Sequence, residues 1–589
     1  VIVGIIDGGF QYNHINFYDT EGKNLRIKRV WNQNQSGTPP TGYYYGTEYT
    51  NAEEIIAAKQ DYAASHATHV TGIAAGAYKG NEYYGIAPDA DLVFVSYNVS
   101  DNSSSNTSIT DGIKYIYDYA ESVGKPCVIN MSLGYHIGPH DGTSTFDRIC
   151  DELQGEGRLL VGASGNEAEY NIHATKTLKK GDTNMKSLVE FVSNWYLYGS
   201  MTSTVDIWGD AEKQLSARVF VYDILNKKEV YSSESFSTTT STSKKISNPT
   251  GADGNIYIST ATNPYNKKGN ITIDLNLSSF DNRNYYIGFE ISGPEETTIN
   301  AWTDAYMSWL SNFGNSEFTN GDNNSTMGEI GGTGKRIITV GAYTSCNYID
   351  HKNSSMWNNS GQTLNQLVSF SSLGPTADGR MKPDITAPGS MLISSFNSST
   401  SSNRNGEDYN YVVKQENVNT VNYYYGSMEG TSMATPVVTG VLATWLQANP
   451  KLTPEQVREI LSNTATTDSY TGNIAGVGNN RWGYGKINAY DGLVYCLNHS
   501  GIEQIGTPTR PMVYPNPATD ICYFLLQNDD KNVNVSIYTL NGTEIYSRYM
   551  GNINAGEQNQ LDLSDLAAGI YFIHITGDKT NMTTKLTVK

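Results

Sequence analysis

Short apolar runs alternate with longer amphipathic segments in the first part of the chain. Val1–Ile6, Leu92–Val95, Cys127–Met131 and Leu159–Gly162 are nearly continuous apolar runs of strand length. Within Ile109–Val123, apolar side chains at positions 113, 116, 117 and 120 follow the period of a helix. Apolar strands that alternate with helices are typical of a parallel sheet with helices on both faces. The pattern therefore predicts an α/β fold here.

The pattern changes after about Glu167 into short segments with period-two alternation. From Tyr170 to about Phe313, runs such as Ala217–Val221 and Tyr285–Phe289 alternate with turns rich in Ser, Thr and Asn. This spacing predicts an inserted antiparallel β-sandwich.

The α/β pattern returns at Arg336–Val340. Helices are predicted over Thr431–Ala448 and Thr453–Thr464, the latter with Pro454 at its first helical position. A polar linker near Ile505–Arg510 leads to a last all-β segment. The expected domains are an α/β domain in two parts (1–168 and 327–500), an inserted β-sandwich (169–326), a linker (501–510) and a C-terminal β-domain (511–589).

Charge and length narrow the possible partners. The chain has 589 residues and a net charge of −19, from 40 basic and 59 acidic side chains. An acidic surface repels phosphate groups, so we do not expect nucleic acid or anionic lipid as a partner. The sequence holds no run of eighteen apolar residues, and we expect no transmembrane segment. Because the chain begins within an apolar strand, we expect that a leader has been removed.

The cysteines do not predict a metal site. No C-x-x-C pair occurs, so we expect neither a zinc nor a redox motif. The apolar surroundings of Cys127 predict a buried structural residue, and the odd number leaves at least one free thiol. Structural Ca²⁺ is compatible with the acidic composition, but no D-x-[DN]-x-[DN]-G loop places it. The five residues are Cys127, Cys150, Cys346, Cys496 and Cys522.

Two motifs near the N-terminus carry residues suited to acid–base chemistry. Asp7 follows the first apolar run, where α/β sheets gather functional groups, although a turn-capping aspartate is the alternative. His66 begins a stretch of small residues that reads as the start of a helix. With His69 it forms H-x-x-H, but the Glu of the zinc motif H-E-x-x-H is absent from the sequence. We expect His69 to be a hydrogen-bonded core histidine.

The third motif is Gly430–Pro436, which leads into the apolar segment Val437–Leu446. Ser432 would lie at the N-terminus of that helix, among unpaired backbone N–H groups that can stabilise an oxyanion. A helix-capping serine is the alternative. Asp7, His66 and Ser432 occur in the order that subtilisin has.

Together the motifs D-x-G, H-x-T-H-V-x-G-I-x-A-G and G-T-S-M-A-T-P resemble those of the subtilisin-like serine peptidases, or subtilases. Gly85–Leu92, Lys382–Gly389 and Gly483–Ala489 are similar to further stretches of that family. The resemblance covers about Val1–Ala168 and Met327–Asn498. It implies a subtilisin-like parallel sheet flanked by helices, and a serine endopeptidase that needs no cofactor for its chemistry.

The resemblance also implies a role for each site residue. Asp7, His66 and Ser432 would form the catalytic triad, and Asn166 would supply an oxyanion-hole amide. An extended protein or peptide substrate would pair with an edge strand of this chain. The residues implied in substrate binding are Ser132, Leu133 and Gly134 of that strand, together with Ser164 and Gly165.

Three further positions bear on the site. Glu167, near the expected S1 pocket, favours basic or polar P1 residues. Gly8 stands where the family usually has Ser or Thr, and Ala67 stands where it usually has Gly. From these departures we expect a looser loop after Asp7 and a more crowded turn at His66.

Two regions resemble more specific groups of proteins. Arg26–Asn34 and Tyr45–Tyr49 are similar to the clostridial spore-germination proteases, a subtilase subgroup with an inserted jelly-roll domain. The tail, with Val513–Asp520, Val535–Gly542 and Leu566–Phe572, resembles the immunoglobulin-like C-terminal sorting domain of the type IX secretion system.

The tail resemblance implies a partner and a location. The partner would be the outer-membrane secretion machinery, and the protein would be secreted or attached to the surface of a Gram-negative (diderm) bacterium. The alternative function is a catalytically weak or inactive scaffold, or an adhesin that acts through its β-domains.

Overall fold

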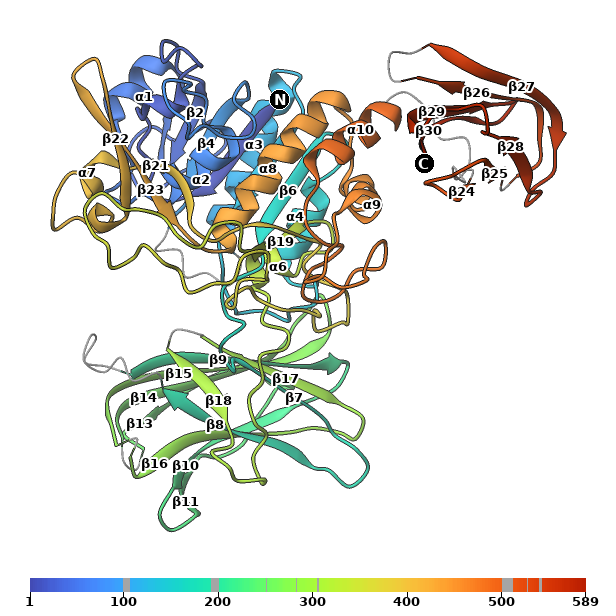
Figure 1. Ribbon diagram of the computed structural model, residues 1–589. Coiled ribbons are helices and arrows are strands. Elements are labelled where there is room, and N and C mark those ends of the chain that lie inside the picture. Colours follow the sequence, from blue (N-terminus) through green and yellow to red (C-terminus); the bar gives the residue numbers. More distant parts are fainter. Residues whose placement is uncertain are drawn as a thin grey trace. The chain divides into compact units, whose positions relative to one another are not determined.

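The computed structural model describes residues 1–98, 106–191, 201–249, 252–281, 283–304, 307–499, 512–526, 528–539 and 543–589. The chain forms two compact units, Val1–Ser500 and Gly501–Lys589 (Figure 1). The predicted linker 501–510 lies outside the described residues. Within the described part, no helix is long and apolar enough to cross a membrane.

An eight-stranded sheet forms the centre of the first unit, in the order β20-β19-β6-β5-β1-β4-β2-β3. All neighbours pair in parallel except β3, which is antiparallel to β2. The predicted α/β fold is confirmed, and the apolar runs expected to be strands lie in this sheet. The strands are β1 (Ile2–Asp7), β2 (Ile27–Asn32), β3 (Thr47–Tyr49), β4 (Asp91–Ser96), β5 (Cys127–Met131), β6 (Arg158–Ala163), β19 (Ile338–Tyr343) and β20 (Ile385–Pro388).

Helices cover both faces of this sheet (Figure 1). On one face lie α2 (His66–Ala75) and α8 (Thr431–Ala448), and on the other lie α3 (Thr107–Ser122) and α4 (Thr145–Leu153). The helices predicted from His66, over Ile109–Val123 and over Thr431–Ala448 are confirmed, whereas α4 was not predicted. The remaining described helices of the unit are α1 (Ala52–Ala58), α6 (Glu329–Gly332), α7 (Ser398–Ser401), α9 (Pro454–Thr464), α10 (Ala489–His499), η1 (Ile15–Phe17) and η2 (Tyr409–Tyr411).

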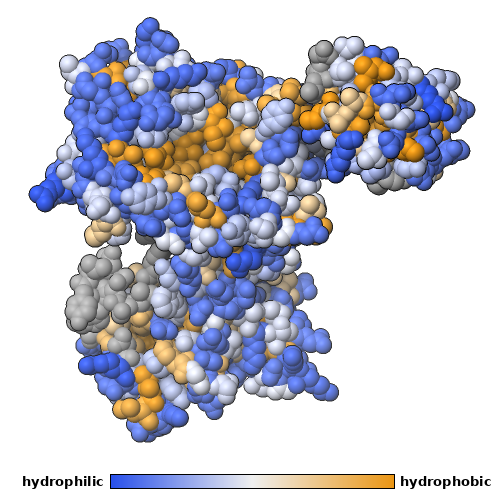
Figure 2. Space-filling view, in the orientation of Figure 1, coloured by the Kyte–Doolittle hydropathy of each residue, from blue (hydrophilic) through white to orange (hydrophobic). Residues whose placement is uncertain are grey.

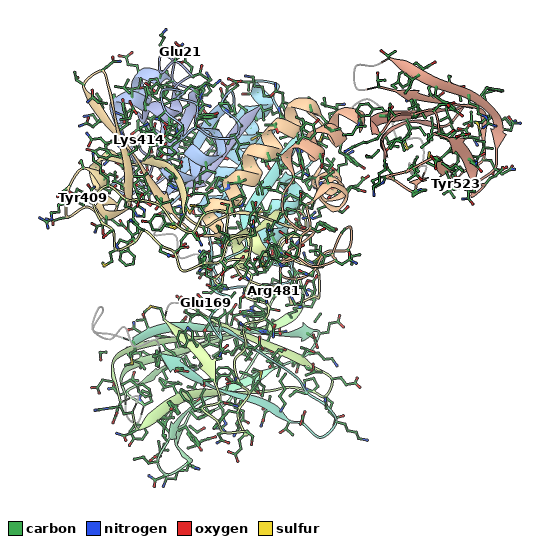
Figure 3. The ribbon with its side chains drawn as sticks, in the orientation of Figure 1. Glu21, Glu169, Tyr409, Lys414, Arg481 and Tyr523 are labelled. Atoms are coloured by element: carbon green, nitrogen blue, oxygen red, sulfur yellow. The ribbon has the colours of Figure 1, made fainter. Side chains whose placement is uncertain are left out.

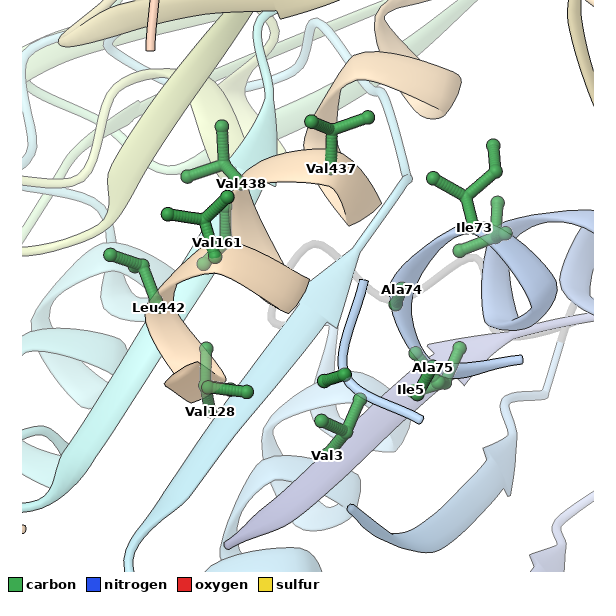
Figure 4. Packing of buried hydrophobic residues seen from close by; sticks show 14 of the residues in the cluster. Val3, Ile5, Ile73, Ala74, Ala75, Val128, Val161, Val437, Val438 and Leu442 are labelled. Carbon is green, nitrogen blue, oxygen red and sulfur yellow. The ribbon is translucent and has the colours of Figure 1, made fainter. Parts of the chain in front are cut away.

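Strand β1 supplies side chains to the cores on both faces. Val3 and Ile5 pack with Val128 and helices α2 and α8 (Figure 4), whereas Ile2 and Ile6 pack on the side of α3. This follows from the alternation of side chains along a strand. Each of these fully buried residues contributes about 1.5–3 kcal/mol to stability.

Helices α2 and α8 have no Asp, Glu, Lys or Arg in their sequences, HATHVTGIAA and TSMATPVVTGVLATWLQA. A helix that is apolar all round belongs in the interior of a protein. The space-filling view also shows apolar residues on the surface of this part of the first unit (Figure 2). The two helices pack against each other at Gly440 of α8, where a Cβ atom would lie 2.7 Å from the carbonyl oxygen of Ala74.

Helix α9 begins as its sequence predicts. Pro454 occupies the first turn, and Thr453 precedes it with extended backbone. The Thr453 hydroxyl accepts a hydrogen bond from the Gln456 backbone N–H at 3.3 Å, and the Gln456 side chain accepts one from the Thr453 N–H at 3.0 Å. This reciprocal capping satisfies two N–H groups that a helix start leaves without partners.

The inserted region forms two antiparallel sheets that share one core. One has the order β11-β10-β16-β8-β18, with β12 paired to β10, and the other has the order β13-β14-β15-β9-β17-β7. Val205 and Ile273 from the second sheet pack with Val219 and Phe289 from the first. The predicted inserted β-sandwich is confirmed. Its strands are β7 (His173–Thr177), β8 (Asn184–Phe191), β9 (Met201–Ala211), β10 (Ser216–Asp223), β11 (Lys228–Ser232), β12 (Phe236–Ser237), β13 (Thr242–Ser247), β14 (Ala252–Thr262), β15 (Lys268–Phe280), β16 (Tyr285–Ser292), β17 (Thr298–Thr303) and β18 (Ser308–Ser311).

A three-stranded sheet, in the order β21-β23-β22, completes the first unit. β21 packs against α2, and β23 ends two residues before Gly430, where α8 is about to begin. The strands are β21 (Leu392–Phe396), β22 (Val412–Val418) and β23 (Val421–Met428).

The second unit consists of two antiparallel sheets around a separate core, as expected for a small β-sandwich. Phe524 and Leu561 from one sheet pack with Val535 and Ile573 from the other. The sheets have the orders β24-β25-β28 and β27-β26-β29-β30. Their strands are β24 (Met512–Tyr514), β25 (Ile521–Leu525), β26 (Asp530–Tyr538), β27 (Glu544–Ile553), β28 (Asn559–Asp562), β29 (Gly569–Thr576) and β30 (Asn581–Val588).

The close approach of α2 and α8 makes a prediction about Gly440. Helix propensity alone favours alanine by about 1 kcal/mol. The new methyl group would press on the Ala74 carbonyl, and overpacking of this kind costs about 3 kcal/mol. We expect Gly440→Ala to lower the free energy of unfolding by about 2 kcal/mol, measured by urea unfolding followed by tryptophan fluorescence.

The matched control is Gly112→Ala in α3. A Cβ atom there meets only side-chain carbons, at 3.0 Å and beyond. It should leave stability nearly unchanged or raise it. Equal effects of the two substitutions would contradict the role given to the helix contact.

Candidate active site

The parallel sheet gathers the sequence-predicted residues at one edge. Ile6 pairs with Met131, and Met131 pairs with Gly162, so β1, β5 and β6 end side by side. Asp7 is the last residue of β1, Ser132 follows β5, and Asn166 follows β6 by three residues. Residues far apart in the sequence therefore meet at the carboxyl edge of the sheet.

Asp7 and His66 form a hydrogen-bonded pair. The His66 Nδ1 atom lies 2.8 Å and 3.0 Å from the two Asp7 carboxylate oxygens. The Asp7 side chain is 4% exposed, whereas that of His66 is 38% exposed and faces the open edge. The backbone N–H of Ala67 donates to the Gly8 carbonyl at 3.0 Å, which fixes the start of α2 beside the end of β1.

The Asp7 carboxylate raises the pKa of the His66 imidazole. Burial disfavours the charged ring and lowers its pKa, but the charge and hydrogen bond of Asp7 outweigh burial, so the pKa of His66 lies above its usual value. The pair therefore stabilises the fold while the ring is protonated. That contribution is complete below the ordinary histidine pKa and is lost as pH rises through the raised value.

Asp61 holds the loop after Asp7, a role that the sequence did not reveal. Its carboxylate accepts hydrogen bonds from the N–H groups of Gly9, at 3.0 Å, and Phe10, at 2.7 Å. Burial raises its pKa to about 6. A Cβ atom on Gly8 would overlap the Tyr62 hydroxyl, so Tyr62 fills the space that a side chain at position 8 would occupy. The structure thus shows a supported loop and not the looser one expected from Gly8.

Ser432 lies in the first turn of α8, directly after Thr431. Its hydroxyl donates to the Ser132 carbonyl at 3.4 Å, and the Ser132 hydroxyl donates to the Ser432 carbonyl at 2.8 Å. Among the hydrogen bonds of the described residues, the Ser432 hydroxyl is not bonded to His66. The structure thus brings the serine to this edge but leaves its hydroxyl turned toward the residue that follows β5.

Two hydrogen-bond donors border one open position beside Ser432. The Asn166 side-chain oxygen accepts from the Thr431 backbone N–H at 2.9 Å and from its hydroxyl at 3.0 Å, which leaves the amide nitrogen facing away from Thr431. A Cβ atom built on Gly430 would lie 3.6 Å from the Ser432 nitrogen and 3.8 Å from the Asn166 Nδ2. An atom placed near this point would lie close to both nitrogens and to the Met433 sulfur, which is 3.7 Å away.

The segment Ser132–Gly134 follows β5 but is not part of the strand, which ends at Met131. Ser132 is buried, Leu133 is half-buried and Gly134 is exposed, with open space where a Cβ atom would point. The backbone of this segment therefore borders the open edge, although the structure does not show the edge strand that was expected.

Ser164 and Gly165 are buried, and their backbone groups form hydrogen bonds within the protein. The Ser164 N–H donates to the Val340 carbonyl at 3.0 Å, and its carbonyl accepts from Gly328 at 3.0 Å. Gly165 has a φ of 109°, which favours glycine, and its N–H lies 3.2 Å from the Thr431 hydroxyl. Both residues support the position of Asn166 through their backbones.

Glu167 is buried, and its carboxylate is already engaged. It accepts a hydrogen bond from the Ser372 hydroxyl at 2.9 Å and lies 3.6 Å from His136 Nε2. These contacts weaken the expectation of a basic P1 residue. The chain then passes from this edge toward the inserted sandwich at Glu169, whose side chain is exposed (Figure 3).

His69 is a core histidine, as expected. Its Nε2 lies 3.0 Å from the Leu392 carbonyl and 3.1 Å from the Gly426 carbonyl. Burial lowers its pKa to about 3, so the ring is neutral and donates to strands β21 and β23 beside it. The described residues hold no group of three or more His, Cys, Asp or Glu side chains suited to a metal ion.

The fold and the site together define a subtilisin-like α/β protein. Residues 1–284 and 230–485 match the model of the subtilase family, and residues 512–589 match the secretion system C-terminal sorting domain. The chain belongs to the subtilase family. The resemblances to the subtilases and to the sorting domain are thereby confirmed.

Individual relatives match shorter stretches. Serine protease AprX of Bacillus subtilis is 36% identical over 158 residues, which are 27% of this chain and 30% of AprX. Subtilisin of Bacillus sp. strain TA39 is 34% identical over 126 residues, 21% of this chain and 28% of that protein. The chain therefore spans less than a third of either relative. The structure of the Clostridium perfringens CspB protease has the same fold, with a TM-score of 0.62 and 20% identity over 85% of this chain and 95% of that one.

The Asp7–His66 pair makes a prediction that does not depend on activity. Because Asp7 holds the pKa of His66 up and burial pulls it down, Asp7→Asn should lower that pKa. The measurement is an NMR titration of the histidine ring signals in the parent and the variant. Asp322→Asn is the control, since Asp322 pairs with His173 at 3.0 Å and should leave the His66 titration unchanged. An unchanged or higher His66 pKa in Asp7→Asn would contradict the geometry described.

Proposed function

We propose that this protein is a secreted serine endopeptidase that hydrolyses protein or peptide substrates with Asp7, His66 and Ser432. The observation that carries the proposal is the nearness of the Ser432 nitrogen and Asn166 Nδ2 to one point, at the edge of the sheet where the Asp7–His66 pair also lies. In this proposal, residues 1–168 and 327–500 carry the catalytic domain, 169–326 the insert and 511–589 the sorting domain.

In the proposed first half-reaction, the Ser432 hydroxyl attacks the carbonyl carbon of the scissile bond. Its proton moves to His66 Nε2, and Asp7 stabilises the imidazolium that forms. His66 then gives the proton to the leaving amine. The hydroxyl must first turn from the Ser132 carbonyl toward His66, and such bonds are often formed only in the complex with substrate.

The same groups complete the reaction. His66 takes a proton from water, which attacks the acyl-enzyme ester, and returns the proton to Ser432. The negative oxygen that forms in each half-reaction would lie between the Ser432 N–H and the Asn166 amide. These steps use only groups of this chain and no cofactor; structural Ca²⁺ has no assigned place in the proposal.

Substrate binding is proposed along Ser132–Gly134. Leu133 and Gly134 lie at the open edge, so their backbone groups are suited to pair with an extended peptide. Ser164 and Gly165 would border the same pocket through their backbones.

The match of residues 512–589 to a sorting domain supports the proposed route. We propose that this domain is recognised by the type IX secretion machinery of the outer membrane. The protein would then be secreted or attached to the cell surface of a diderm bacterium.

Substitutions of the proposed nucleophile and of the proposed oxyanion donor should lower kcat by different amounts. Ser432→Ala should reduce kcat by about 10⁶-fold, the loss seen on removal of the nucleophile in subtilisin. Asn166→Ala should reduce kcat by about 10²–10³-fold with little change in KM, as loss of one oxyanion donor does in subtilisin. Peptide hydrolysis and labelling by a fluorophosphonate probe measure both effects.

Ser427→Ala is the matched control for the series. The Ser427 hydroxyl lies 2.6 Å from His351 Nε2, so it forms a buried serine–histidine pair outside the proposed triad. Its loss should leave probe labelling intact. Labelling that survives in Ser432→Ala and disappears in Ser427→Ala would overturn the assignment, and a parent that neither labels nor cleaves would favour an inactive scaffold.

The separate core of the second unit predicts that peptidase activity does not need the tail. Deletion of Pro511–Lys589 should leave kcat/KM on a peptide within about twofold of the full chain, because the proposed triad and oxyanion residues all lie in Val1–Ser500. In the native host the truncated protein should remain in the periplasm, as measured by cell fractionation. An inactive fragment, or normal surface delivery, would contradict the division of roles.

A further inference from the structure

Among the parts of the chain that the inserted sandwich contacts is a short segment, Tyr135–His140, which follows directly after Ser132–Gly134. We name Tyr135–His140 the clamp segment. Its Gly138 N–H donates to the carboxylate of Asp206 in strand β9 of the insert, at 2.8 Å. The clamp segment is thus continuous with the proposed substrate-binding residues at one end and bonded to the insert at the other.

Asp206 is built into the insert as a fixed acceptor. It is 1% exposed, and its carboxylate also accepts from Trp208 Nε1 at 2.7 Å, Asn270 Nδ2 at 2.8 Å and the Thr272 hydroxyl at 3.1 Å. Burial raises its pKa to about 6, against the effect of these four hydrogen bonds. A buried carboxylate that is held only by neutral donors costs free energy. Its hydrogen bond from a peptide N–H outside the sandwich therefore points to a function for Asp206 beyond the stability of the sandwich.

Two neighbouring strands present further contacts at the same place. Trp302 of β17 pairs directly with Asp206 in the sheet, and its ring stacks on His140 at 4.1 Å with an interplanar angle of 16°. Lys268, at the start of β15, lies 2.6 Å from the buried carboxylate of Asp141, the residue after the clamp segment. Three adjacent strands, β15, β9 and β17, therefore form one face that holds this part of the chain.

The clamp segment is held from the catalytic side as well. The Glu329 N–H donates to the Tyr135 carbonyl at 2.6 Å, and its carboxylate accepts from the His140 N–H at 2.9 Å. Gly138 has a φ of 147°, and a Cβ atom there would lie 2.7 Å from a Glu329 carboxylate oxygen. Only glycine fits between the carboxyl groups of Asp206 and Glu329.

The clamp segment also contacts the backbone stretch that contains Asn166 and Glu167. His136 lies 3.6 Å from Glu167, the residue after Asn166. A shift of the clamp segment would therefore change the spacing between the two backbone stretches that border the proposed substrate site. It would leave the Asp7–His66 pair untouched, because none of the contacts of the clamp segment described above involves α2 or β1.

We infer that Asp206 is a positioning residue for substrate binding: by holding the Gly138 N–H, the inserted sandwich fixes the Ser132–Gly134 backbone in the place where an extended peptide binds. The inference rests on the proposed peptidase function. It gives the insert a role in peptide affinity, through a residue that touches neither the substrate nor the triad.

The test compares Asp206→Ala with Asp210→Ala. Asp210 lies in the same strand, and its carboxylate accepts from the Thr298 N–H at 2.7 Å within the insert, without contact to the clamp segment. We expect Asp206→Ala to raise KM for an extended peptide by roughly tenfold or more, the effect of losing a hydrogen bond to a charged group. Its kcat and its rate of labelling by a small fluorophosphonate should stay within about threefold of the parent. Asp210→Ala should change none of these quantities.

Two further variants separate positioning from general damage. Asp206→Asn keeps an oxygen acceptor for the Gly138 N–H, so KM should return close to that of the parent. Lys268→Ala removes the neighbouring ion pair from a partly exposed position and should raise KM in the same direction, even if Asp206→Ala does not fold. Hydrogen exchange of the backbone amides in residues 132–140 should become faster in Asp206→Ala and stay as in the parent in Asp210→Ala.

The inference is overturned if KM is unchanged in a folded Asp206→Ala, or in Lys268→Ala where Asp206→Ala does not fold, or if kcat and labelling fall together with peptide affinity. Failure of the proposed function looks different, because the parent itself would then neither label nor cleave. In that case calorimetric binding of the same peptide to the parent and to Asp206→Ala replaces KM. Equal affinities, or no binding to either protein, would overturn the inference.

Discussion

Parallel pairing of β1, β5 and β6 is the constraint on which the candidate site depends. It places Asp7 at the same edge of the sheet as Ser132 and Asn166, although Asp7 precedes both by more than a hundred residues in sequence. Helices α2 and α8 then bring His66 and Ser432 to the same edge. This requires the two helices to pack closely, which the absence of a side chain at Gly440 allows.

The site also depends on the hydrogen-bond partners of its buried carboxylates. Asp7 is paired with His66, whereas Asp61 is held by backbone N–H groups and Asp206 by one such group and three side chains. Burial raises the pKa of both Asp61 and Asp206 to about 6, because the neutral donors around them offset only part of the cost of desolvation. Asp61 and Asp206 each hold backbone that borders the site, and neither takes part in the proposed reaction.

The inserted sandwich contacts the chain that continues from the proposed substrate-binding residues of the α/β domain. Asp206, Lys268 and Trp302 lie on three adjacent strands and meet the chain between Gly138 and Asp141. An insertion between Asn166 and the rest of the catalytic sequence could have been attached by its two connections alone. The buried contacts show instead that it has a defined face toward the segment that continues from Ser132–Gly134.

The sequence by itself determined the fold class, the main strands and helices, and the motifs around Asp7, His66 and Ser432, because apolar periodicity and short local motifs are readable without tertiary contacts. His69 was correctly expected in the core for the same reason. Only the tertiary structure decided that Tyr62 fills the space beside Gly8, that Asp61 supports the Asp7 loop, and that Ser132–Gly134 follows its strand and does not extend it. It also decided the partner of Asp206. Such contacts join residues that are dozens of positions apart, and their sequence neighbours carry no pattern that marks them, so they follow from packing and not from local sequence.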